Sequence, residues 1–228
     1  AATPRVGVLS CGYRRIDAEG RVLETVAAVS GPARLRLHLM FANPILHPGA
    51  MIRAPLLRAH GGYAEDWRLS QDLELWARLA PHTRFDNIAA PLMDWRRHGA
   101  ASMATRDADA WSRAGAVHRA LLEAYLGASV EGEAAACAAL LFWGRKALSL
   151  EQARAGDAVL RAVARRAALR EPPGAQLFLR ARAAVALARS AAAAEPSAAR
   201  AMRLMALRWR PGPTAIRAVL ADLLRRAP

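Results

Sequence analysis

The carboxyl group of Asp72 is the side chain best placed for acid–base chemistry, because it lies at the start of a predicted helix. Four apolar residues of that stretch recur at helical spacing: Leu69, Leu73, Trp76 and Leu79. Ser70 precedes Asp72 as a candidate N-cap. The helix dipole stabilises an acidic residue there by about 0.3 to 1 kcal/mol, which by itself would explain the aspartate. Carboxylates also take protons from reacting groups, so a chemical role stays open.

Residues 43 to 102 contain a series of short motifs in a fixed order. They are Asn-Pro-Ile-Leu-His-Pro at 43–48, Met-Ile-Arg at 51–53, Gly-Gly-Tyr at 61–63, Gln-Asp-Leu-Glu-Leu-Trp at 71–76 and Trp-Arg-Arg-His at 95–98. In order and spacing this series resembles the C-terminal half of the catalytic domain of family-two glycosyltransferases, whose A-type fold is Rossmann-like. Agreement over the whole segment is more specific than any single motif.

The resemblance implies a role for Asp72. Its position matches the aspartate that serves as general base in inverting members of the family. That base takes the proton from the acceptor hydroxyl while the hydroxyl oxygen attacks the anomeric carbon of the donor sugar. A correctly positioned base of this kind gives about 10² to 10⁴ in rate.

The resemblance also implies a divalent metal and a nucleotide-sugar donor. His98 matches a histidine that helps to bind Mg²⁺ or Mn²⁺ on the nucleotide diphosphate, where the metal neutralises the leaving group. A surface histidine at a strand end is the alternative. Arg96 and Arg97 lie beside His98, and Arg97 is the candidate contact to phosphate.

Five further positions match substrate-binding segments of the family. Asn43 and His47 match the segment before the acceptor site, although His47 could simply satisfy a loop hydrogen bond. Gly61 and Gly62 match a turn beneath the donor sugar, and a helix stop would use the same residues. Trp76 could form the floor of an acceptor pocket for a saccharide or lipid-linked acceptor, but its helical spacing equally suits a core position.

The chain departs from the family pattern in two ways. The glutamate before the catalytic aspartate is Gln71 here, and the usual tyrosine near the end is Trp95. The larger departure is that nothing before residue 43 resembles the nucleotide-binding strands or the Asp-x-Asp motif. Residues 5 to 26 instead resemble the segment that follows that motif. We therefore expect a fragment that lacks the donor half, is inactive alone, and has an unpaired sheet edge with uncovered apolar surface.

The two halves of the chain predict different architectures. In residues 1–109 we expect a hairpin over 6–26, a short helix between Pro55 and Gly61, and one or two extended segments over 83–98 broken by Pro91. In residues 110–228 we expect a bundle or a set of helical hairpins. The helical segments are 109–127, 131–150, 151–170, 174–194, 196–210 and 213–226. Together with the resemblance, this pattern implies a partial α/β glycosyltransferase domain, Rossmann-like and A-type, followed by an all-α extension that resembles the helical tails of bacterial members of the family.

Composition leaves a second function open. The formal charge is +14, yet Lys146 is the only lysine, so the arginine excess resembles a genome-wide bias more than a selected surface. No block of basic residues interleaved with aromatics indicates nucleic acid. The alternative function is a non-catalytic basic helical module that binds a protein, an anionic lipid or nucleic acid. Because Cys11 and Cys137 match no metal or redox spacing, we expect reduced thiols and a cytoplasmic location, with peripheral association at the inner membrane face left open.

Overall fold

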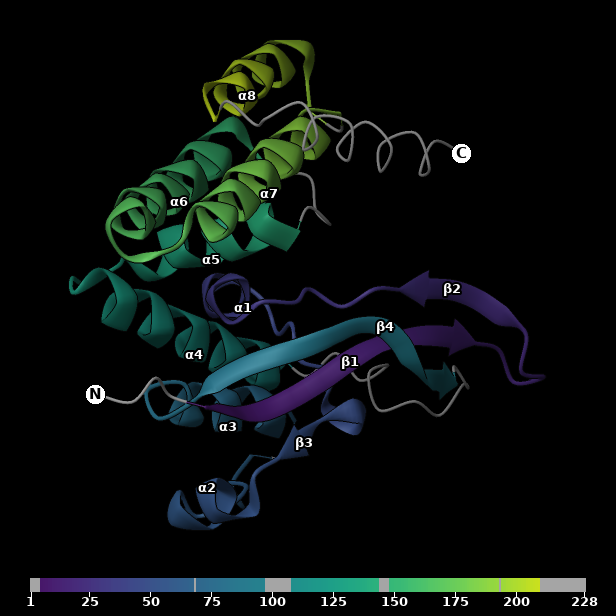
Figure 1. Ribbon diagram of the computed structural model, residues 1–228. Helices are drawn as coiled ribbons and strands as arrows, with labels where there is room; N and C mark the ends of the chain where they lie inside the picture. The colour runs from purple at the N-terminus through teal and green to yellow at the C-terminus, as the bar shows by residue number, and fades with distance from the viewer. Residues whose placement is uncertain (1–4, 68, 97–107, 144–147, 193, 210–228) are drawn as a thin grey trace. The chain divides into compact units, whose positions relative to one another are not determined.

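The computed structural model describes residues 5–67, 69–96, 108–143, 148–192 and 194–209 (Figure 1). The chain divides into two compact units. The first comprises residues 1–39 and 43–117, and the second comprises residues 40–42 and 118–228. The predicted boundary was at residues 109 and 110, whereas the observed boundary falls inside helix α4 (Ala108–Leu126).

A four-stranded mixed sheet forms the centre of the first unit. Its central strand is β1 (Val6–Ile16), which pairs antiparallel with β2 (Val22–Val26) and with the short strand β3 (Met51–Ile52). On its other side β1 pairs in parallel with β4 (Arg84–Arg96), and the two long strands run side by side in Figure 1. The predicted hairpin over 6–26 is confirmed. The parallel partner of β1 is distant in the sequence, because Val6 pairs with Arg84.

Pro91 does not break the last extended segment, as the sequence suggested, because β4 continues through it as one strand. A β-bulge in β4 accommodates the proline. Cys11 of β1 pairs with Ile88, and the next residue of β1, Gly12, pairs with Pro91. A Cβ atom at Gly12 would lie 2.6 Å from the Val26 carbonyl oxygen, so only glycine fits there.

The expected unpaired edge is present in the described part of the chain, where β4 pairs with β1 alone. Large apolar side chains of β4 and β3 are also exposed, with exposed fractions of 43% for Ile88, 63% for Leu92 and 73% for Met51. These three line a groove of about 250 Å³ that also reaches Cys11 and Gly49. The first unit therefore exposes apolar surface that a globular domain normally covers.

The described part of the first unit also contains three further helices, one 3₁₀ turn and the start of α4. Helix α1 (Pro32–Leu39) packs on β4 and was not predicted. The turn η1 (His47–Gly49) precedes β3, and α2 (Ala54–Ala59) follows it. Helix α3 (Gln71–Leu79) was predicted, and it buries the apolar face that its spacing indicated.

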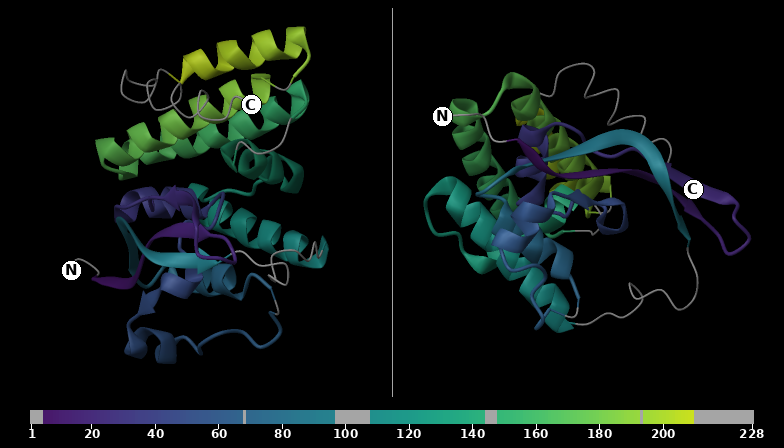
Figure 2. Two further views of the ribbon diagram at one scale, coloured as in Figure 1. Left: turned by 90° about the vertical axis from the view of Figure 1, so that its right-hand side faces the viewer. Right: turned by 60° about the horizontal axis from the view of Figure 1, so that its bottom comes forward.

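The second unit is helical, as predicted. It contains the end of α4, α5 (Gly132–Trp143), α6 (Leu150–Arg170), α7 (Pro173–Ala192) and α8 (Pro196–Arg208) (Figure 2). Helices α5, α6 and α7 pack against one another, and α8 packs on α7 and α6.

Two local features set the packing and the bounds of α5 and α6. A Cβ atom at Gly156 would lie 2.8 Å from the Cys137 carbonyl group, so glycine lets α6 approach α5 closely. The helix expected over 131–150 is shorter, because Ser149 caps α6 through a capping box with Gln152. The segment 213–226 lies outside the described residues. Within the described ranges, no helix has the length and apolar character that crossing a membrane requires.

Candidate active site

Asp72 and Asn43 meet at the start of α3. The Asn43 Nδ2 amide donates a hydrogen bond of 2.7 Å to Asp72 Oδ2, and its Oδ1 accepts one of 3.1 Å from the Ile45 backbone N–H. Asp72 is partly exposed. Among the described residues Oδ1 of Asp72 accepts no hydrogen bond, so one oxygen is anchored and the other is available. Asn43 holds the carboxylate in place without adding a positive charge.

His47 and Tyr63 form a second polar contact close to Asp72. The His47 Nε2 atom lies 3.0 Å from the Tyr63 hydroxyl, and the two ring centroids are 5.5 Å apart. Burial raises the pKa of the Tyr63 phenol above its ordinary value, and the negative charge of Asp72 raises it further. The structure therefore brings together Asn43, His47, Tyr63 and Asp72.

Trp76 lies beneath this cluster and belongs to the core. Its exposed fraction is 0%, and its ring meets that of His47 edge to face at a centroid distance of 6.3 Å. A ring with no open face has no surface on which a sugar can stack. Trp76 was expected to form the floor of an acceptor pocket, but its ring has no open face. The burial of Trp76 favours the alternative, a core position.

The loop that carries Asn43 and His47 is fixed to the sheet by two buried polar side chains. Asn87 of β4 donates hydrogen bonds of 3.0 Å to the Pro44 carbonyl oxygen and 2.9 Å to that of Val29. The Ser10 hydroxyl of β1 donates one of 2.8 Å to the Leu46 carbonyl oxygen. Asn87 and Ser10 are 4% and 2% exposed, so these bonds form away from water, where losing a partner is costly.

Gly61 and Gly62 form the stop of α2. Their φ angles are +77° and +69°, the left-handed region that favours glycine. The Gly62 N–H bonds to the Leu57 carbonyl oxygen at 3.1 Å and the Gly61 N–H to that of Arg58 at 3.3 Å, which is a Schellman motif. A Cβ atom at either glycine would meet nothing within 4 Å, so conformation, not crowding, requires glycine.

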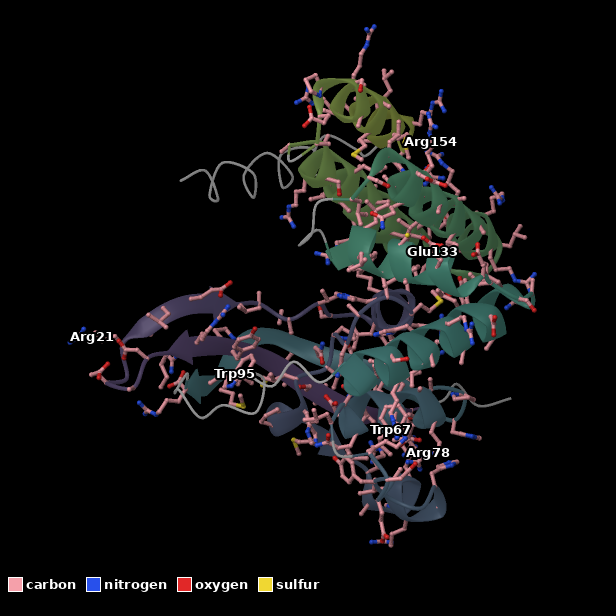
Figure 3. The ribbon with its side chains drawn as sticks, turned by 180° about the vertical axis from the view of Figure 1, so that it is seen from behind. Arg21, Trp67, Arg78, Trp95, Glu133 and Arg154 are labelled. Atoms are coloured by element: carbon pink, nitrogen blue, oxygen red, sulfur yellow. The ribbon has the colours of Figure 1, made fainter. Side chains whose placement is uncertain are left out.

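Arg78 of α3 ties this glycine turn to the helix that carries Asp72 (Figure 3). Its guanidinium donates to the Gly62 carbonyl oxygen at 2.8 Å and to that of His60. The same group makes two hydrogen bonds of 2.8 Å to Glu74, one turn earlier on α3. Because Tyr63 follows directly on Gly62, Arg78 holds the residue before Tyr63 against the last turn of α3.

The residue before α3 has unusual backbone geometry. Ser70 is the only non-glycine residue with positive φ in the described part, at +58°. It occupies the predicted N-cap position, but its side chain makes no capping hydrogen bond. A left-handed residue of this kind costs of order 1 to 3 kcal/mol and is found most often near functional sites. Only one residue, Gln71, separates this strained position from Asp72.

Arg97 and His98 lie outside the described residues, so their predicted contacts to phosphate and metal stay predictions. Elsewhere in the described ranges no group of three or more His, Cys, Asp or Glu side chains could hold a metal ion.

Four residues of the site had no assigned role in the sequence: Ser10, Tyr63, Arg78 and Asn87. A signal for two of them exists, because strand alternation places Ser10 on the buried face of β1 with Val8 and Asn87 on that of β4 with Phe85. A polar residue on a buried face needs a partner. No comparable local signal marks Tyr63 or Arg78.

Comparison with models of known protein families, with curated proteins and with solved structures gives no match for this chain.

Proposed function

We propose that this chain carries the acceptor half of an inverting glycosyltransferase that uses a nucleotide-sugar donor, with Asp72 as the general base. The observation that carries the proposal is the hydrogen bond between Asn43 and Asp72. These residues lie in two separate motifs of the series, and their side chains meet. Parallel pairing of β1 with β4 further supports the Rossmann-like A-type fold.

The reaction assigns one step to this chain's own residues. The oxygen of an acceptor hydroxyl attacks the anomeric carbon, its proton passes to Asp72, and the bond from that carbon to the diphosphate oxygen breaks with its electron pair. The anomeric configuration inverts because attack comes from the face opposite the leaving group. The unbonded Oδ1 of Asp72 is the atom available for the proton, while Asn43 holds Oδ2.

Donor and metal binding are not assigned to these residues. Nothing before residue 43 resembles the nucleotide-binding strands or the Asp-x-Asp motif, so we expect no turnover from the 228 residues alone. The metal, Mg²⁺ or Mn²⁺, would neutralise charge on the leaving diphosphate when bound. No step above depends on it.

The test uses the complete product of the gene, with whatever it includes beyond these residues, and a panel of nucleotide sugars. Release of nucleoside diphosphate in the presence of a saccharide or lipid-linked acceptor reports transfer. We expect Asp72→Asn to lower kcat by about 10² or more while donor affinity is retained, because only proton transfer is lost. The matched control is Asp66→Asn, an exposed aspartate near α3. Transfer at the parent rate by Asp72→Asn would remove Asp72 from the role.

A further inference from the structure

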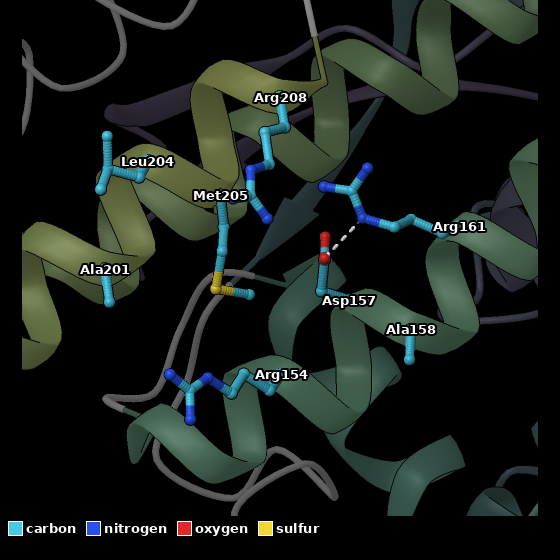
Figure 4. A pocket seen from close by; sticks show the side chains of 8 residues that line it. All are labelled: Arg154, Asp157, Ala158, Arg161, Ala201, Leu204, Met205 and Arg208. Carbon is cyan, nitrogen blue, oxygen red and sulfur yellow. Dashed lines mark hydrogen bonds and ion pairs between the residues drawn. The ribbon is translucent and has the colours of Figure 1, made fainter.

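The second unit contains a groove of about 330 Å³ between α6 and α8, lined by three arginines (Figure 4). They are Arg154 and Arg161 of α6 and Arg208 of α8. One carboxylate, that of Asp157, lies among them. The charge at the groove is therefore positive, and Figure 4 shows the ends of Arg161 and Arg208 above Asp157.

Both carboxylate oxygens of Asp157 already accept hydrogen bonds from side chains of the same unit. Its Oδ1 accepts a hydrogen bond of 2.7 Å from the buried indole N–H of Trp209, at the end of α8. Its Oδ2 accepts one of 2.7 Å from Arg161 Nε, and the Arg161 guanidinium lies 4.9 Å from the Trp209 ring centroid. Asp157 thus joins α6 to α8 and balances one guanidinium of the three.

The arginines retain unused donors. Nη2 of Arg161 is buried and has no hydrogen-bond partner in the part of the chain that the structure describes. Within the same ranges neither Arg154 nor Arg208 forms an ion pair with a carboxylate. Planar guanidinium groups with free donors match the oxygens of a phosphate group. The groove therefore has the chemistry of a phosphate-binding site.

Apolar side chains beside the arginines indicate where such phosphates would come from. Leu204, which lines the groove, is 53% exposed, and Leu207, one turn further along α8, is 70% exposed. Arg200 and Arg203 are exposed on the same helix. A free phosphate ion would make no use of the leucines. A helix face that alternates leucine with arginine suits the interface of a lipid bilayer, with apolar groups below the headgroups.

We propose that this groove and the exposed face of α8 bind the phosphate headgroups of an anionic membrane surface. Nucleic acid fits less well, because the aromatic ring of the groove, Trp209, is 4% exposed and offers no face for a base. The C-terminal segment 210–228 has four arginines and one aspartate, so it does not carry the negative charge that the groove would attract. The proposal does not depend on sugar transfer.

The test is sedimentation of the full chain with vesicles of phosphatidylcholine alone or of equal parts phosphatidylcholine and phosphatidylglycerol. Each arginine near an anionic surface contributes roughly fivefold in partitioning, so Arg154→Gln with Arg208→Gln should lower binding to the anionic vesicles by about 30-fold. Arg161 is left unchanged because it holds Asp157. The charge-matched control is Arg165→Gln with Arg180→Gln, two exposed arginines that do not line the groove. An equal loss in that control would mean that overall charge, not the groove, drives binding, and would overturn the proposal.

A second pair of variants separates a membrane from other sources of phosphate or negative charge. Leu204→Ser with Leu207→Ser should weaken vesicle binding at least fivefold, whereas Leu169→Ser with Leu177→Ser, on exposed positions of α6 and α7, should not. Unchanged binding by the first pair, together with full competition by inorganic phosphate, would identify a site for soluble phosphate and contradict the proposal. Failure of the parent chain to sediment with anionic vesicles, with binding to an acidic peptide instead, would also contradict it.

Discussion

Replacing Arg78 by methionine should release the glycine turn from α3 and disturb the candidate site without touching Asp72. Methionine keeps the unbranched stem of arginine, so the loss is confined to the guanidinium. The turn would keep its own Schellman bonds to α2. Its connection to α3, and with it the position of Tyr63, would depend on the remaining packing alone.

The size of the effect follows from four hydrogen bonds. Two go to Glu74 in a partly buried i,i+4 pair, and helix pairs of this spacing contribute about 0.3 to 0.5 kcal/mol. Two go to the carbonyl oxygens of His60 and Gly62, and charge-assisted bonds of this kind contribute about 1.5 kcal/mol each at the lower end of their range. The lower end applies because the Arg78 side chain is 31% exposed and water can replace it in part. The free energy of unfolding of the first unit should therefore fall by about 3 kcal/mol.

Hydrogen exchange and a tyrosine titration measure this change locally. The Gly62 amide should exchange faster in Arg78→Met, and the pKa of Tyr63 should move toward its ordinary value as the phenol becomes better hydrated. Arg58→Met, at an exposed position of α2, is the matched control and should change neither. A loss below about 0.5 kcal/mol with an unchanged Tyr63 titration would refute the argument that Arg78 positions the turn.

Two further predictions use the pKa shifts. Burial lowers the pKa of Arg182 to about 10, and the nearby charge of Arg189 contributes, so Arg182→Met should raise the free energy of unfolding at pH 7 by about 1 to 2 kcal/mol. Thermal unfolding measures this gain, which should shrink as the pH rises above 10, because folded Arg182 then loses its proton more readily than unfolded Arg182 does. A variant less stable than the wild type at pH 7 would contradict the reasoning. Because the pKa of Tyr63 is raised, its contribution to stability is complete below its unfolded pKa and is lost as the pH rises through the higher folded value. Asp72→Asn should remove only part of the upward shift in the Tyr63 pKa, since burial is its main cause. Phenolate absorbance measures the titration, and Tyr63→Phe identifies the signal of Tyr63. An unchanged titration in Asp72→Asn would show that the two groups do not interact.

Helices with a strong local pattern could be predicted from the sequence. In α3 the apolar spacing sets the buried face, and in the second unit Gly, Pro and Ser residues punctuate successive helices. Helix α1 shows why the rule fails elsewhere. Leu35, Leu37 and Leu39 alternate as in a strand, yet they form a helix that buries several of its sides. Only Arg34 and Arg36 of α1 are exposed, so most of the helix surface is covered and the sequence shows no clear amphipathic pattern.

Long-range pairing left no local trace in the sequence. The parallel contact of β1 with β4 joins segments separated by three helices, and nothing in either strand specifies its partner. The bulge at Pro91 depends on that pairing, because a proline is tolerated only where β4 lacks a second neighbour. Periodicity gives the conformation of a segment, but tertiary contacts decide which segment lies beside it.

The candidate site shows the same division between local pattern and tertiary contact. Spacing put Asp72 at a helix start, but only the motif series suggested that Asn43 belongs with it, and the two are 29 positions apart. What brings them together is the loop after α1, which Asn87 and Ser10 hold on the sheet. The strand pattern alone would place apolar side chains at those two buried positions. Burying a polar side chain there costs free energy unless it forms hydrogen bonds with the loop carbonyl groups. The two polar side chains are therefore best explained as supports for the loop that orients Asp72. In this fold, the carboxylate's geometry depends on residues that never touch it.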